Sequence, residues 1–524
     1  MTPADDPCPG LDDPTPDDDA GAAARAALAG DLGTALRLAD SALRTGDHDG
    51  RLLGARVLAA VLPQRGLLAR AAEVHRWLAR QAPGSSPDAV LSLLGTGALD
   101  EARDAVAAPA DALPGLRGGA DALVAEGLLA SVDGRDGSAG TSLSLLVRAT
   151  TSLAATAERT PLADSPAALG ALLALHRGEP ELAEPLLDLA VDADLGGPAL
   201  RRRHLLLRAW SAMLRDDEPA ARSALAAAHD QPGTTEPRDE LLAVACEVAL
   251  ARRDGDTRRL LELWSRARQA LLRHPVDLYC LLPVGELAIA AARLGEDPWV
   301  EPHLAAAGTL LAALGDPPSW STAWHWARLQ AAITADDRTT AGTHAAALDT
   351  AATVNDRAAA PARAAHVWLE VLAGQIDAEA VTAAATALRA VGLARDGARL
   401  AGEAAIRTTD RTDSATLLAC ARTVTAARTP TAPGPVPALP DDGASRATVV
   451  TRARREAASG QLTDRERDIA ELVLEGMTYR EIAGRLFLST KTVEHHVARI
   501  RRRLGSESRA ELFSELRVLV GAAP

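Results

Sequence analysis

The feature that most constrains the fold is a short polar turn that recurs about every 38–41 residues through the middle of the chain. Each turn is followed by an Ala/Leu-rich stretch of helical pattern, and a period of this length is typical of stacked helical hairpins. Less regular turns near Gly30, Gly66, Gly97 and Asp133 extend the series towards the N-terminus. The regular turns are Gly178-Glu179-Pro180, Asp216-Asp217-Glu218-Pro219, Asp254-Gly255-Asp256, Gly295-Glu296-Asp297-Pro298, Asp336-Asp337 and Gly374-Gln375-Ile376-Asp377.

Between these turns the sequence is helical in pattern from residue 20 to about residue 426. Ala and Leu recur at i, i+3 and i+4, and runs of β-branched residues are missing. A single hairpin cannot bury its apolar face, so neighbours stack into one long core with a concave surface. We therefore predict an all-α chain with an α-solenoid over residues 20–426. It resembles tetratricopeptide-like repeats in architecture but not in consensus, and an irregular all-helical domain is the alternative.

Two segments of different composition flank this region. Residues 1–19 contain seven aspartates and five prolines with almost nothing to bury, which predicts a disordered acidic tail. Residues 427–445 hold five prolines between positions 430 and 440, which excludes a helix and favours an extended spacer. We expect a linker at 427–445 and a separate C-terminal domain at 446–524.

The charge of the chain is unevenly distributed. The net charge is -14, yet residues 446–524 carry 15 basic and 11 acidic side chains, and the remaining 445 residues carry 41 and 59. The C-terminal segment is therefore positive by 4 and the rest negative by 18. An acidic chain can contact nucleic acid only through a local basic patch, and this segment is the one that offers it.

Residues 462–520 predict four short helices with explicit start signals. Capping boxes begin at Thr463, Thr478 and Ser508, and Ser489 is placed to cap the third helix. In that third helix the apolar residues follow a 4-3-4 spacing that keeps them on one face: Val493, Val497, Ile500 and Leu504. Two short helices joined by a tight turn, the second one basic on its free face, predict a helix-turn-helix.

The third helix, at about 490–504, is the expected recognition helix, because one helix fits the major groove of DNA. Its outward row would be Lys491, Glu494, His495, Ala498 and Arg502. The positive N-terminal end, which suits a phosphate, holds Ser489, Thr490, Lys491 and Thr492. The positive charge continues along the DNA backbone through Arg499, Arg501, Arg502 and Arg503. The alternative is a helical bundle that binds no DNA. It does not explain why the helix caps, the apolar face of the third helix and the cluster of basic residues occur together.

The segment LTDRERDIAELVLEGMTYREIAGRLFLSTKTVEHHVARIRRRLGSESRAEL resembles the C-terminal domain of LuxR-type (LuxR/GerE) regulators, over about 60 of the 524 residues. The resemblance implies double-stranded promoter DNA as partner, a homodimer that often pairs through the fourth helix, and a contact with RNA polymerase. By position in the family pattern, the phosphate contacts would be Lys491, Thr492 and Arg499. The residues facing bases would be Glu494, His495 and Ala498.

Two of these positions depart from the family. LuxR-type regulators often have Lys where this chain has Glu494, and a basic or polar residue where it has Ala498. Glu494 could accept a hydrogen bond from N4 of cytosine, or it could only repel the backbone and sharpen selectivity. Both alternatives remain open for the base code.

The chain contains a single lysine, which excludes several kinds of input domain. Of the 56 basic residues only Lys491 is lysine, so a P-loop, a kinase site and the functional lysine of a receiver domain are all missing upstream. Aromatic residues make up 2 % of the chain, unlike the aromatic-rich acyl-homoserine-lactone sensor. The region is similar instead to the solenoid half of large ATP-binding LuxR regulators, without their ATPase.

Three tryptophans cluster within the repeats. Trp320 and Trp324 would share a helical face and Trp326 would point elsewhere, so core packing at a repeat seam is favoured over a ligand-stacking site. His204, His325 and His366 show no ligand spacing and are expected to be surface or hydrogen-bonded core residues.

Cofactor and metal motifs are missing as well. The four cysteines have no Cys-x-x-Cys pair, and we find no nucleophile elbow, metal cluster or phosphate loop. We therefore predict no enzyme activity, no cofactor and no metal. With neither a signal peptide nor an apolar run of about 18 residues, a cytoplasmic, nucleoid-associated protein without membrane contact is expected.

The sequence thus predicts a DNA-binding transcriptional regulator. An unknown small molecule or protein bound to the solenoid would control it, because the solenoid offers a concave surface. The alternative is a helical-repeat scaffold for protein interactions, in which the terminal domain is minor or vestigial.

Overall fold

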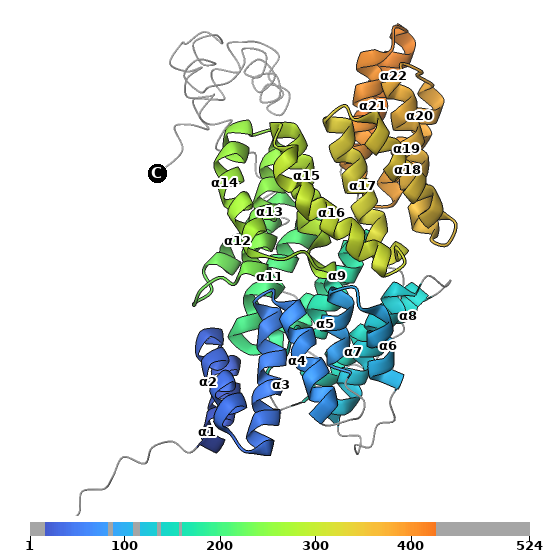
Figure 1. Ribbon diagram of the computed structural model, residues 1–524. Coiled ribbons are helices and arrows are strands. Elements are labelled where there is room, and N and C mark those ends of the chain that lie inside the picture. Colours follow the sequence, from blue (N-terminus) through green and yellow to red (C-terminus); the bar gives the residue numbers. More distant parts are fainter. Residues whose placement is uncertain (1–15, 82–86, 108–115, 134–137, 157–159, 426–524) are drawn as a thin grey trace, which may run out of the picture. The chain divides into compact units, whose positions relative to one another are not determined.

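The computed structural model describes residues 16–81, 87–107, 116–133, 138–156 and 160–425 (Figure 1). Within these ranges all regular secondary structure is helical, which confirms the predicted all-α class. None of these helices is long and apolar enough to cross a bilayer.

The N-terminal part of the array consists of α1 (Pro16–Leu28), α2 (Leu32–Thr45), α3 (His48–Gln64), α4 (Leu68–Gln81), α5 (Ala89–Gly95), α6 (Leu99–Ala107), α7 (Leu116–Val132) and α8 (Ser138–Ala154). The middle part consists of α9 (Pro166–His176), α10 (Pro180–Asp192), α11 (Gly197–Leu214), α12 (Glu218–His229), α13 (Pro237–Asp254), α14 (Thr257–Arg273), η1 (Leu278–Cys280), α15 (Leu281–Leu294) and α16 (Asp297–Ala313). The last part consists of α17 (Pro318–Thr334), α18 (Arg338–Ala352), η2 (Asp356–Ala358), α19 (Ala359–Leu372), α20 (Ala378–Ala390), α21 (Ala394–Arg407) and α22 (Arg411–Thr425).

The six regular turns predicted from the sequence all join the two helices of a hairpin, from α9–α10 to α19–α20. Each turn contains one residue with positive φ, at Gly178, Asp216, Gly255, Gly295, Asp336 and Gly374. Glycine adopts this left-handed conformation without a steric penalty and aspartate tolerates it, so the period in sequence marks where each first helix ends. Gly30, Gly66 and Gly97 occupy the same place in earlier hairpins.

In several hairpins an aspartate caps the N-terminus of the second helix. The side chains of Asp217, Asp256, Asp337 and Asp377 each accept a hydrogen bond from a backbone N–H of the first helical turn. Such a cap satisfies a donor that the helix itself leaves unpaired. Four of the six hairpins thus combine a left-handed residue with a capping aspartate, whereas α10 and α16 begin without a side-chain cap and carry a proline in their first turn. The recurring turn confirms the predicted repeat.

Successive hairpins stack through their first helices. Helix α11 packs on α13, α13 on α15 and α15 on α17, and α17 also returns to contact α9. One large core extends from α4 to α17, and a second core covers α17 to α22. Helix α17 belongs to both, because Trp320 and Trp324 pack into the first core while Trp326 packs into the second. The predicted packing of the three tryptophans is confirmed.

The chain divides into two compact units, residues 1–427 and 428–524. The predicted linker 427–445, the predicted domain 446–524 and residues 1–15 lie outside the described residues. At the N-terminus α1 begins at Pro16, so the predicted boundary between residues 19 and 20 falls inside a helix. Proline is compatible with a first helical turn because its missing N–H has no partner to lose there.

Candidate functional site

The residues predicted to contact DNA lie outside the part of the chain that the structure describes. They are Ser489, Thr490, Lys491, Thr492, Glu494, His495, Ala498, Arg499, Arg502 and Arg503, and their roles stay a prediction. The site that can be built from described residues lies in the helical repeats.

A partly enclosed cavity of about 170 Å³ lies among the first helices of successive hairpins. Its lining comes from α9, α11, α13, α15, α17, α19 and α21, together with the turns next to them. The stacking of first helices on one another gives a repeat array its concave inner surface. The cavity is therefore a consequence of the repeat, and it collects residues from 175 to 396.

One edge of the cavity closes where the α9–α10 turn meets the loop before α21. A Cβ on Gly178 would lie 3.1 Å from the carbonyl oxygen of Val391, so the two backbones are in direct contact. Two ion pairs lie nearby: Arg357 of η2 pairs with Glu179 at 3.0 Å, and Arg395 of α21 pairs with Asp216 of the α11–α12 turn at 2.5 Å. The last hairpins are thus held against the middle of the array.

The wall of the cavity combines buried apolar side chains with charged groups. The apolar part includes Leu175, Trp210, Leu281, Ile289, Trp326 and Pro361. The charged part contains five arginines and three carboxylates: Arg177, Arg252, Arg253, Arg357, Arg395, Asp216, Glu286 and Asp396. Arg252 pairs with Glu286 at 2.7 Å, and Trp326 donates its indole N–H to Asp396 at 2.8 Å.

His176 is the most unusual residue of the lining. It is 2 % exposed, and neither of its ring nitrogens makes a hydrogen bond of good geometry, although a backbone group of Trp320 lies near enough to offset part of the effect of burial on its pKa. Its ring lies 4.8 Å from that of Trp320, whose indole N–H is taken by Ser131. Burial lowers the pKa of His176 to about 3. The ring is therefore neutral at physiological pH and offers one donor and one acceptor.

Three further lining residues carry a buried polar atom without a partner. Gln330 accepts a hydrogen bond from Arg399 through Oε1, at 2.9 Å, but its Nε2 is unpaired. The Nε atoms of Arg252 and Arg253 are also unpaired, although the other guanidinium nitrogens of these residues bind Glu286 and the carbonyl of Met213. A buried donor without a partner costs about 1–3 kcal/mol, so such atoms mark places where a ligand or a water is bound.

An apolar wall with a few convergent polar groups is the usual make-up of a small-molecule site. A cavity of this size compares with an engineered one of about 150 Å³ that accepts benzene. The site can therefore bind a small organic molecule and hold its polar group.

This site was not predicted from the sequence. Of Trp320, Trp324 and Trp326, the three tryptophans with a possible role in ligand stacking, Trp326 lines the cavity. His204 is buried with its Nε2 2.6 Å from Ser165 Oγ, His325 contacts His344 and Asp316, and His366 is exposed, as expected for surface or hydrogen-bonded histidines. His176 ends the apolar run AALGALLALH, and a polar residue at the end of a fully buried helix was the signal that could have pointed to it.

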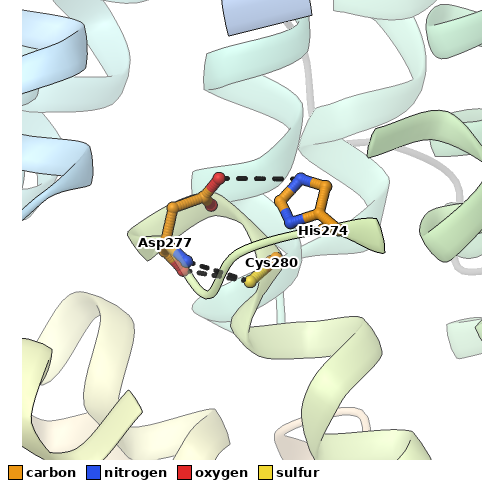
Figure 2. A group of neighbouring side chains, drawn as sticks. All are labelled: His274, Asp277 and Cys280. Carbon is orange, nitrogen blue, oxygen red and sulfur yellow. Dashed lines mark hydrogen bonds and ion pairs between the residues drawn. The ribbon is translucent and has the colours of Figure 1, made fainter. Parts of the chain in front are cut away.

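A second group of side chains lies between α14 and α15 (Figure 2). The ligand atoms of His274, Asp277 and Cys280 lie within 4.8 Å of one another, and all three residues are buried. Asp277 N–H donates to Cys280 Sγ and the thiol donates back to the Asp277 carbonyl, both at 3.2 Å. His274 Nδ1 lies 2.6 Å from the carbonyl oxygen of Pro275, and Asp277 Oδ1 accepts from Tyr279 N–H.

These residue types could hold a metal ion, and their His-x-x-Asp-x-x-Cys spacing was visible in the sequence but not recognised. A metal would bind the thiolate form; with no metal present, burial raises the pKa of Cys280 well above its usual value and also raises that of Asp277. The backbone of Gly66 packs beside His274 Nε2, since a Cβ added to Gly66 would lie only 2.8 Å from that nitrogen. The contacts are those of a cap that begins η1 and α15.

Comparison with known proteins places the C-terminal segment in a family. Residues 460–516 match the bacterial regulatory proteins of the luxR family. The spore germination protein GerE of Bacillus subtilis is 42% identical over 55 residues, which are 10% of this chain and 74% of GerE. The chain belongs to the LuxR family of bacterial regulatory proteins.

Other relatives match over short stretches of the chain. The DNA-binding transcriptional activator DevR/DosR of Mycobacterium tuberculosis is 40% identical over 86 residues, or 14% of this chain and 40% of that protein. A protein of the same species named as an HTH-type transcriptional regulator is 45% identical over 56 residues, or 11% of this chain. The match spans only 6% of the length of that mycobacterial relative.

Two solved structures are similar over most of the chain. One is the APC/C hetero-tetramer Cut9–Hcn1, with a TM-score of 0.39, 14% identity and coverage of 75% of this chain and 80% of that one. The other is yeast Tom70, with a TM-score of 0.22, 12% identity and coverage of 78% and 88%. The repeat architecture rests on the hairpins themselves and not on these scores.

Proposed function

We propose that the protein is a sequence-specific DNA-binding transcriptional regulator, with its recognition helix at about 490–504 in the major groove of promoter DNA. The LuxR-family match at residues 460–516 carries this proposal. The positive charge of residues 446–524 in an otherwise acidic chain supports it. Lys491, Thr492 and Arg499 contact phosphates, and Glu494, His495 and Ala498 face bases.

The helical repeats act as the input domain in this proposal. A small molecule or protein bound there alters either dimerisation or access to the DNA-binding domain, and the cavity among the first helices supports a ligand site. The regulator acts as a homodimer in the cytoplasm and contacts RNA polymerase at its promoters.

The charge asymmetry also suggests how the helical repeats could control DNA binding. The acidic repeats, with a net charge of -18, would compete with DNA for the basic C-terminal unit, with its net charge of +4. The segment matched in GerE makes up 74% of that protein, so a domain of this kind exists largely on its own. Residues 446–524 alone should then bind DNA more tightly than the full chain, and equal affinity would exclude masking.

The test is genome-wide DNA enrichment with the tagged full-length protein, compared with a Lys491→Ala/Arg499→Ala variant. Sharp peaks that share an inverted repeat and disappear in the variant are expected. A matched control, Arg452→Ala/Arg454→Ala, removes the same charge from the same unit outside the recognition helix and should keep the peaks. Absence of peaks from both the full chain and residues 446–524 would favour the scaffold alternative.

A further inference from the structure

The cavity contains more hydrogen-bond donors without partners than acceptors. Its unpaired buried atoms are the Nε atoms of Arg252 and Arg253, Nε2 of Gln330 and the two ring nitrogens of His176. The first three are donors, and neutral His176 adds one donor and one acceptor. A molecule that satisfies these groups must itself be rich in acceptors.

Two of the unpaired donors belong to guanidinium groups, which favours an anionic acceptor. Each of the five lining arginines also pairs with a carboxylate, so what the arginines offer a ligand is the unpaired Nε of Arg252 and of Arg253. Hydrogen bonds from a guanidinium to a carboxylate are shorter and roughly twice as strong as neutral ones. Because His176 and Gln330 are both at least nine-tenths buried, a bound carboxylate would meet them away from bulk water.

The rest of the lining defines the body of the ligand. Trp210, Leu281 and Trp326 are buried apolar side chains of the wall, so the part of the ligand beyond its carboxylate is apolar. The volume of about 170 Å³ limits that part to one ring or a short alkyl chain. Water alone could satisfy the polar atoms, but it would leave the apolar wall without a partner.

We propose that this cavity is the effector site and that it binds a small organic acid with one carboxylate and an apolar body. His176, Arg252, Arg253 and Gln330 hold the acid group. These residues come from α9, α13 and α17, so the ligand contacts three different hairpins. Binding itself is independent of the proposed function, whereas its effect on transcription rests on it.

The test is calorimetric titration of the full-length protein with phenylacetate and hexanoate, and with their neutral amides, phenylacetamide and hexanamide. We expect each acid to bind at least about tenfold more tightly than its amide, which corresponds to about 1.4 kcal/mol. The proposal is wrong if neither acid binds, or if acids and amides bind equally well.

Two variants assign the binding to this cavity. Gln330→Glu keeps an oxygen for Arg399 but replaces the unpaired donor with a negative acceptor, and His176→Phe removes both ring nitrogens. Each should weaken acid binding at least about tenfold, since a hydrogen bond to a charged group contributes about 1.5–3 kcal/mol. His75→Phe is the matched control, because His75 is also buried with an unpaired nitrogen but does not line the cavity. Equal loss in His75→Phe would overturn the assignment.

A DNA-binding measurement separates this proposal from the previous one. The Lys491→Ala/Arg499→Ala variant should bind the acids as tightly as the unmodified protein while losing its promoter contacts. If the protein binds the acids but no promoter, the proposed regulatory function is wrong and the proposed acid site is retained. If it binds promoters but none of the acids, the acid site is wrong and the regulatory function is retained.

Discussion

Gly178 lies directly against the backbone of Val391, although the two residues belong to different hairpins far apart in the sequence. Gly178 has a φ of +70°, and a Cβ built on it would lie 3.1 Å from the Val391 carbonyl oxygen. This contact closes one edge of the cavity. Gly178 therefore has two roles: it adopts the left-handed conformation of its turn, and it packs against a residue far away in the sequence.

The substitution Gly178→Ala should therefore destabilise the protein more than the same change in another turn. Gly374→Ala is the matched control, because Gly374 has a φ of +80° and nothing within 4 Å of its added Cβ. We expect a loss of about 1–2 kcal/mol for the control, from the left-handed conformation alone, and a larger loss for Gly178→Ala. Urea denaturation followed by circular dichroism measures both, and equal losses would show that the contact with Val391 is not needed.

The buried ion pair between Arg203 and Asp164 should be hard to break. Arg203 Nε lies 2.7 Å from Asp164 Oδ2, and both side chains are 3% exposed. Arg203→Met leaves the buried carboxylate of Asp164 with one of its two arginine partners, Arg238 at 3.2 Å, and is expected to cost up to about 3–5 kcal/mol of unfolding free energy. Arg258→Met removes an exposed partner of Glu262 and should change stability by less than about 1 kcal/mol. Similar losses in the two variants would contradict this account.

Acid should destabilise the repeats through their buried histidines. Burial lowers the pKa of His176 to about 3 and that of His204 to about 4. Below about pH 6.5 the unfolded chain takes up protons at these residues and the folded chain does not, so stability falls as the pH drops towards 4. Each residue contributes about 1.4 kcal/mol per pH unit within that window. Denaturation at several pH values should show a shallower dependence for His176→Phe, and an unchanged slope would exclude the contribution of this residue.

DNA binding should depend on salt through the predicted phosphate contacts. In the Lys491→Ala/Arg499→Ala variant the slope of log K against log salt should decrease by about 2, because each phosphate contact contributes about 0.9. Fluorescence anisotropy on a promoter fragment from the enrichment experiment measures this slope. The Arg452→Ala/Arg454→Ala control should keep the original slope, and an equal decrease there would point to a general charge effect.

Much of the fold could be predicted because its signals are local. The turns at Asp216, Gly255 and Asp336 can be read from residue type alone, since a left-handed residue followed by a capping side chain needs no long-range partner. The start of α1 was misplaced because the aspartates and prolines of residues 1–19 suit a solvated tail as well as a first helical turn.

The cavity could not be predicted, because its lining residues are brought together only by stacking. His176, Arg252 and Gln330 belong to three hairpins, and no spacing in the sequence relates them. Nor does residue type show that both ring nitrogens of His176 lack a partner, whereas His204 contacts Ser165 through its Nε2. That difference depends on which atoms the neighbouring helices present.

The sequence by itself determined the hairpins, their period and the family of the C-terminal segment, because caps, turns and helix periodicity act over a few residues. Only the tertiary structure decided that the last hairpins return to the middle of the array and enclose a cavity with unpaired donors. The curvature of a helical array is the sum of many small packing angles, and each of these depends on contacts between residues that lie a full repeat or more apart.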